Sequence, residues 1–190
     1  VPSPFYRANE LRDYYNELTL RFKKDWNVEF RAYNDGIAYR FVSRSKKPFN
    51  VVDETVDYRF PSDMVASVPY VKAGKDGDYE SQYFNSFENT YTTDRLSKLN
   101  KKRLMFLPLV VDAGEGVKIC ITESGLENYP GLYLSAAEGE KRLTGQFAPY
   151  PKKTVQGGHN QLQMLVKERE AYIAKVDNPR SFPWRMSIVT

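Results

Sequence analysis

Apolar and polar side chains alternate in the first part of the chain, and this pattern constrains the fold most strongly. Apolar residues occupy every second position in residues 18–22 and 28–32, and residues 37–42 form a third apolar-rich run. A period of two is typical of a strand that buries one face. Residues 23–27 separate the first two runs. Asp35–Gly36 precedes the third, and this dipeptide often forms hairpin turns because both residues tolerate positive φ. The pattern predicts a meander of three antiparallel strands.

Further short apolar runs, separated by glycine and proline turn signals, continue to the end of the chain. We expect strands at residues 56–60, 104–111, 117–121, 132–134, 162–166, 172–174 and 186–188. The run 104–111 is apolar without interruption, which is typical of a strand that is buried on both faces. Many short strands at this spacing predict an all-β fold, an antiparallel β-sandwich or a barrel.

Three segments depart from the strand pattern. Asn9–Tyr15 and Asp94–Leu99 could each form a short helix. Residues 65–100 have the weakest pattern and are rich in Tyr, Asn and Ser, so we expect long loops there.

Length and composition exclude several classes of protein. A chain of 190 residues fits one domain, residues 1–190. The lone Cys120 excludes an intrachain disulfide and multi-cysteine metal sites, and the lone His159 excludes sites built from several histidines. The net charge of +4 is small for this length and gives weak support for a nucleic-acid partner. The longest apolar run, residues 104–111, contains a proline and is far shorter than the roughly 20 residues of a membrane span.

Both ends of the chain suggest a piece of a longer protein. The chain starts at Val1 without a methionine or a signal segment, and residues 184–190 have the pattern of a strand that is cut off. We therefore expect further polypeptide beyond this sequence, and a signal peptide would lie outside it.

Glu123 breaks the alternation of its strand. Val117, Ile119 and Ile121 place Glu123 on the same, apolar face. A carboxylate there is costly unless a cation or hydrogen-bond donors satisfy it. The simplest interpretation is that the strand leaves the core at this point and Glu123 meets water. The alternative is a ligand for a hard cation such as Ca²⁺, which takes 6–8 oxygens, so that most ligands would come from elsewhere.

Other polar residues give weaker signals. Glu127 is best explained as a solvated loop acid beside the Tyr129–Gly131 turn, and we do not assign it with Glu123 as a catalytic pair. His159 follows two glycines without a nucleophile motif, so it is best explained as a loop residue.

A basic cluster at Arg95–Arg103 follows the aromatic residues of Tyr79–Tyr91. Aromatic rings beside cations can stack on nucleic-acid bases, and sugars also stack on tyrosines. Acidic residues are interspersed, and no RNA-binding sheet motif is present. The simplest interpretation is a solvated loop that leads into a buried strand.

Four segments, in order, resemble the N-terminal domain of glycoside hydrolase family 97. They are Asn16–Leu20, Phe30–Phe41, the stretch from Ile121 to Leu132 that contains Thr122-Glu123-Ser124 and Tyr129-Pro130-Gly131, and Arg180–Arg185. The resemblance covers nearly the whole chain. Family members more often have Ala at the position of Ser124 and Met at the position of Leu132.

The resemblance implies a β-sandwich of the galactose-mutarotase-like super-sandwich type, upstream of a catalytic (β/α)₈ barrel that would follow residue 190. The family contains inverting α-glucosidases and retaining α-galactosidases, mostly exported by Gram-negative bacteria, and uses a Ca²⁺ ion near the scissile bond. One calcium ligand comes from the N-terminal domain, at the position that matches Glu123. The other carboxylate ligands and the catalytic residues belong to the barrel.

We therefore expect a non-catalytic domain that packs on its own barrel and supplies Glu123 as a ligand to calcium in the full-length enzyme. We expect the full-length enzyme to act on α-linked oligosaccharides, in the periplasm or outside the cell. The fragment alone is expected neither to hydrolyse glycosides nor to hold calcium, and we expect no nucleic-acid partner and no membrane span. A stand-alone carbohydrate-binding module that uses the tyrosines of Tyr79–Tyr91 is the alternative. A single-strand nucleic-acid binder that uses Arg95–Arg103 is a weaker one. The preference for α-glucosides or α-galactosides, and inversion or retention, remain open at this point.

Overall fold

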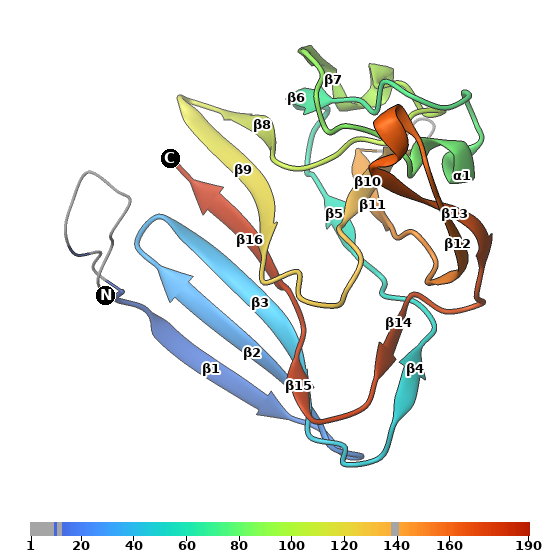
Figure 1. Cartoon of the computed structure of the whole chain (residues 1–190). Coiled ribbons are helices and arrows are strands. Elements are labelled where there is room, and N and C mark those ends of the chain that lie inside the picture. The colour runs from blue at the N-terminus through green and yellow to red at the C-terminus, as the bar shows by residue number, and fades with distance from the viewer. Residues whose placement is uncertain (1–9, 11–12, 138–140) are drawn as a thin grey trace.

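One antiparallel sheet of nine strands dominates the part of the chain that the computed structural model describes, which is residue 10 and residues 13–137 and 141–190. Eight strands follow one another in the order β1-β2-β3-β16-β9-β8-β6-β7, and β15 also pairs with β3 (Figure 1). Their bounds are β1 Asn16–Arg21, β2 Trp26–Tyr33, β3 Gly36–Ser43, β16 Trp184–Val189, β9 Val117–Ser124, β8 Leu109–Gly114, β6 Val65–Pro69, β7 Tyr91–Arg95 and β15 Arg180–Ser181.

Three smaller sheets lie toward one side of the large sheet (Figure 1). Their strands are β10 Tyr133–Ala136, β11 Arg142–Gln146 and β5 Asp57–Arg59; β12 Pro151–Gly157 and β13 Gln163–Arg169; and β14 Ala174–Val176 and β4 Phe49–Val51. The helical elements among the described residues are one turn of α-helix, α1 Tyr79–Gln82, and the 3₁₀ turns η1 Leu96–Lys98 and η2 His159–Gln161. The prediction of an all-β antiparallel sandwich is confirmed.

The predicted meander is present as β1, β2 and β3. The turn chemistry differs from the prediction, because the positive φ angles occur at Lys24 and Asp25, between β1 and β2. Gly36 is required for another reason. A Cβ at this position would lie 2.6 Å from the backbone oxygen of Ser187, so glycine allows β16 to approach β3 closely.

The prediction of long loops over residues 65–100 is partly wrong. β6 lies inside the large sheet between β8 and β7, and its Ala66 and Val68 are completely buried. The five residues of β6 include Ala66, Ser67 and Pro69, so the apolar signal of this strand is weak. The predicted helix at Asp94–Leu99 is reduced to the single turn η1, and β7 precedes it.

The predicted strand 104–111 is also shorter than expected, since β8 begins at Leu109. Pro108 has no N–H to donate to a sheet, which explains the interruption. Met105 still exchanges two backbone hydrogen bonds of 2.8 Å with Leu134 of β10. Leu104 and Met105 are completely buried, so the apolar run forms core without forming a continuous strand.

The other predicted strands are found with shifted ends, the largest shift being three residues, at the C-terminal ends of β9 and β13. The strands β4, β11 and β12 were not predicted, since their sequences are short or polar. Three of the seven residues of the predicted helix Asn9–Tyr15 lie outside the described residues, and the other four, Glu10 and Asp13–Tyr15, are not helical. No helix in the described ranges is long and apolar enough to cross a membrane.

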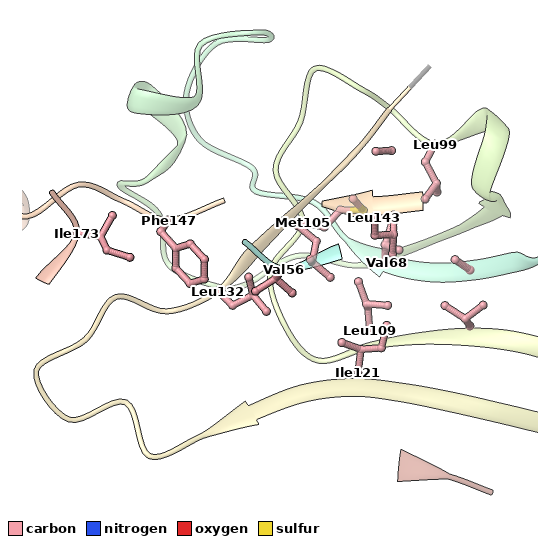
Figure 2. Packing of buried hydrophobic residues seen from close by; sticks show 14 of the residues in the cluster. Val56, Val68, Leu99, Met105, Leu109, Ile121, Leu132, Leu143, Phe147 and Ile173 are labelled. Atoms are coloured by element: carbon pink, nitrogen blue, oxygen red, sulfur yellow. The ribbon is translucent and has the colours of Figure 1, made fainter. Parts of the chain in front are cut away.

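The main core fills the space between the large sheet and the smaller sheets (Figure 2). Ile121 and Leu109, neighbours in β9 and β8, meet residues of the opposite layer such as Leu143 and Val56. The other half of the same sheet face is different. There Leu18 is 56% exposed and Ile37 is 62% exposed, so the second layer covers only part of the large sheet.

Charged side chains anchor β16 on the other face of the sheet. The guanidinium groups of Arg31 and Arg40 lie 4.7 Å and 4.3 Å from the centre of the Trp184 ring. Ion pairs to Glu17 and Glu29 hold these two arginines. Trp184, the first residue of β16, is therefore packed against β2 and β3.

The core assignment predicts that Leu134→Ala lowers the free energy of unfolding by about 2–5 kcal/mol, because Leu134 is completely buried and its truncation leaves a cavity. Leu162→Ala is the matched control, since Leu162 is 82% exposed and should change the stability by no more than about 0.5 kcal/mol. Urea denaturation measures both values. Equal effects of the two substitutions would contradict the layer arrangement.

Candidate functional site

Glu123 lies near the end of β9, on the face of the large sheet that carries the core. Cross-strand pairing places Glu123 opposite Arg185 of β16, Arg185 opposite Tyr39 of β3, and Tyr39 opposite Phe30 of β2. The Glu123 side chain is 10% exposed. It therefore neither points freely into water nor lies sealed in the apolar interior.

The cation that pairs with Glu123 is Arg185, whose side chain is 1% exposed. The Nη1 group of Arg185 donates to Oε2 of Glu123. Its Nε and Nη2 groups donate to the two carboxylate oxygens of Glu54, each at 2.8 Å. The Tyr129 hydroxyl also donates to Oε2 of Glu54, at 2.9 Å. One guanidinium therefore joins two carboxylates in a buried cluster.

The loop after β9 fixes the second oxygen of Glu123. The backbone N–H of Leu132 donates to Oε1 at 2.9 Å. A Cβ on Gly131 would lie 3.4 Å from Oε1, so the glycine keeps the space beside this oxygen open. Arg180 donates to the backbone oxygens of Glu127 and Asn128 and ties the loop to β15. Both oxygens are thus held in place, each by one donor.

Burial disfavours both charges of the pair, but only for Arg185 do the partners outweigh the effect of burial on the pKa. Burial raises the pKa of Glu123 above its usual value, although the Leu132 N–H and Arg185 act in the opposite direction. Burial also disfavours the charge of Arg185, but its bonds to Glu54 and its attraction to both carboxylates leave the Arg185 pKa raised. A further cation beside Glu123 would favour its ionised form.

A single carboxylate of this kind fits one position in a calcium site and no more. Each Glu123 oxygen accepts one hydrogen bond and keeps further acceptor capacity. Within the described residues, no group of three or more His, Cys, Asp or Glu side chains could hold a metal ion. Glu54, the nearest second acid, uses both oxygens on Arg185.

The other predicted candidates lie apart from this cluster. Glu127 is exposed in the loop, and its backbone oxygen accepts from Arg180. His159 is exposed in η2, where its backbone N–H donates to the side-chain oxygen of Gln163.

The tyrosines of the predicted sugar-binding segment take part in packing. The hydroxyl groups of Tyr79 and Tyr91 donate to backbone oxygens, at 3.1 Å and 2.7 Å. The Tyr83 ring packs against Tyr133, with centroids 5.4 Å apart. Each of the three tyrosines thus makes a structural contact, and Tyr91 is 49% exposed.

Two arginines of the basic cluster are also engaged in local structure. Arg103 pairs with Asp76 at 2.7 Å and donates to two backbone oxygens. Arg95 donates to the backbone oxygen of Asp63 at 3.0 Å.

Sequence reasoning missed Glu54, Tyr129 and Arg185 as members of the site. Arg185 gave no signal of burial, since period-two alternation groups it with the polar Ser187 and opposite the apolar Trp184, Met186 and Ile188. Glu54 carried none, because it lies between two strands in a polar stretch and is 131 residues from Arg185 in sequence.

Comparisons with a family model, with a curated protein and with solved structures all point to glycoside hydrolase family 97. Residues 2–190 match a family described as glycosyl-hydrolase 97 N-terminal. The chain is 80% identical over 190 residues to the retaining alpha-galactosidase of Bacteroides thetaiotaomicron, and it spans only 29% of the length of that protein. A glycoside hydrolase family 97 enzyme from Pseudoalteromonas sp. strain K8, solved with acarbose, superposes with a TM-score of 0.70 at 16% identity, over 100% of this chain and 26% of its own. A beta-arabinopyranosidase gives 0.66 at 20% identity, over 93% and 27%.

The buried cluster predicts that Arg185→Met lowers the free energy of unfolding by about 3–5 kcal/mol, because two carboxylates would remain buried without their cation. Arg59→Met, which removes an ion pair with Asp57 from an arginine that is 75% exposed, should cost no more than about 1 kcal/mol. Urea denaturation at several pH values measures the difference. Lowering the pH should recover part of the Arg185→Met loss, since protonation removes the uncompensated charge. A pH-independent loss would contradict the assignment.

Proposed function

The chain belongs to the glycosyl-hydrolase 97 N-terminal family, and from this we propose that it is the non-catalytic N-terminal domain of a calcium-dependent α-glycosidase, in which Glu123 is one ligand of the metal. The observation that carries the proposal is the state of Glu123. It is a nearly buried carboxylate, oriented by two donors, in a cluster of two acids and one arginine. The excess negative charge of this cluster favours a cation at its open side.

The metal would be shared with the remainder of the parent protein. Ca²⁺ takes 6–8 oxygen ligands, and one carboxylate supplies at most two. Bound close to the scissile bond, calcium would orient the sugar and polarise the departing oxygen. In this chain, Leu132 and Arg185 hold the Glu123 carboxylate in one orientation, and Gly131 leaves space beside it. The catalytic acid and the base or nucleophile would come from the barrel.

The partly uncovered face of the large sheet is the proposed contact with the rest of the parent chain. Leu18 pairs across the sheet with Phe30, on the same face as Glu123, and these two side chains are 56% and 39% exposed. Leu20 and Ile37 add to this apolar surface. Exposed apolar side chains that gather on one face mark an interaction surface. The relative extends well beyond the part that this chain matches, which provides the material to cover it.

We also propose that the parent acts on α-linked galactosides. The supporting observation is the 80% identity to a protein named as a retaining alpha-galactosidase. The family resemblance supports a periplasmic or secreted location for the parent.

The Glu123 assignment predicts that Glu123→Gln in the full-length parent lowers calcium affinity and turnover together, each by about tenfold or more, because the amide is a neutral and weaker ligand. Calcium titration by calorimetry and an α-galactoside hydrolysis assay measure the two effects. Glu127→Gln is the control and should leave both unchanged, since Glu127 is exposed and lies outside the cluster. Wild-type calcium affinity and turnover in the Glu123→Gln enzyme would remove Glu123 from the metal site.

Shared ligation also predicts that the 190-residue domain alone binds calcium too weakly for calorimetry to resolve. The physical reason is that one carboxylate leaves most of the coordination sphere to water. Circular dichroism should first establish that the isolated domain is folded. Tight one-to-one binding of calcium by this domain would contradict a shared site.

A further inference from the structure

The proposed ligand Glu123 is held by a second layer of residues, Glu54, Tyr129 and Arg185, to which neither the family resemblance nor the comparisons assign a role. Arg185 and Glu54 are 1% and 7% exposed in their side chains. Buried ion pairs rarely improve stability over apolar residues of the same volume, so their presence invites a functional explanation.

The hydrogen bonds divide unequally between the two carboxylates. Glu54 takes two donors from Arg185 and a third from the Tyr129 hydroxyl. Glu123 takes one donor from Arg185 and one from the Leu132 backbone. Glu54 therefore holds the guanidinium in a fork-to-fork arrangement, and the remaining Nη1 group is directed at Glu123.

The positive charge of Arg185 is also shared unequally between Glu54 and Glu123. One guanidinium compensates two carboxylates, and two of its three nitrogens donate to Glu54. Glu123 is thereby oriented by Arg185 without being fully neutralised by it. A lone arginine–glutamate pair would instead direct the whole positive charge at the ligand and oppose the approach of a divalent cation.

We propose that Glu54, Tyr129 and Arg185 are positioning residues for calcium: Glu54 and Tyr129 fix Arg185, and Arg185 fixes the Glu123 carboxylate while leaving it net negative charge. This inference rests on the proposed function of Glu123. The role is comparable to that of the outer groups that orient metal ligands in other proteins, whose loss costs about 10–100-fold in metal affinity.

The test uses the full-length parent enzyme with Glu54→Gln, which keeps the side-chain shape but frees Arg185 to neutralise Glu123. Calcium affinity should fall by about tenfold in calorimetric titration. Glu29→Gln is the matched control, because it breaks the half-buried ion pair with Arg40 on the other face of the same sheet. Its calcium affinity should equal that of the wild type.

Tyr129→Phe provides a second, milder variant in case Glu54→Gln does not fold. It removes one donor to Glu54 and changes no charge, so a smaller loss, about two- to fivefold, is expected. Tyr79→Phe is its control, since the Tyr79 hydroxyl donates to the backbone oxygen of Lys101 and to no member of the cluster.

Melting temperatures in EDTA separate positioning from stability. Wild-type calcium affinity in Glu54→Gln and Tyr129→Phe, with lowered melting temperatures, would assign a structural role only and overturn the inference. The Glu123→Gln variant distinguishes failure of the positioning role from failure of the proposed ligand role. If it alone lowers the affinity, the positioning role fails and the ligand role stands; if it has no effect, the proposed function itself fails.

Discussion

The ion cluster of Arg185, Glu54 and Glu123 is the constraint around which this domain is arranged. A guanidinium that is 1% exposed requires partners for its charge and its donors, and the two glutamates meet most of that requirement. The three residues come from the end of β9, the start of β16 and the segment between β4 and β5. The cluster therefore fixes the large sheet and the second layer relative to each other, at the point where the proposed ligand lies.

The two halves of the large sheet differ in how their inner face is covered. Around β8 and β9 the inner face is packed with core residues such as Leu109 and Ile121. Along β1 to β3 the same face carries exposed apolar side chains, Leu18 and Ile37 among them. Glu123 and Arg185 lie between the two halves. A ligand at the boundary between a closed core and an open face is suited to be shared with another part of a larger protein.

Much of the architecture could be predicted from the sequence, because strand alternation is local. The meander, the position of β9 and the unusual place of Glu123 all follow from residues within a few positions of one another. The strand β6 was missed because small residues such as Ala66 give a weak apolar signal, and Pro108 delays the start of the strand predicted at 104–111 to Leu109. The partners of Glu123 could not be predicted at all. Arg185 is 62 residues from it and Glu54 is 131 residues from Arg185, so only the folded topology brings them together.

The position of β16 between β3 and β9 has a consequence for biosynthesis. The meander and the β8–β9 hairpin can pair locally as soon as each leaves the ribosome, but β16 supplies the hydrogen bonds that join them. Until residues 184–189 emerge, β3 and β9 each present an open edge with unpaired backbone groups. Such edges are sites of aggregation in nascent chains. Two features would favour rapid pairing of this late strand with β3 over pairing with a neighbouring polypeptide. Gly36 allows β16 to approach β3 closely, and Trp184 packs against the guanidinium groups of Arg31 and Arg40.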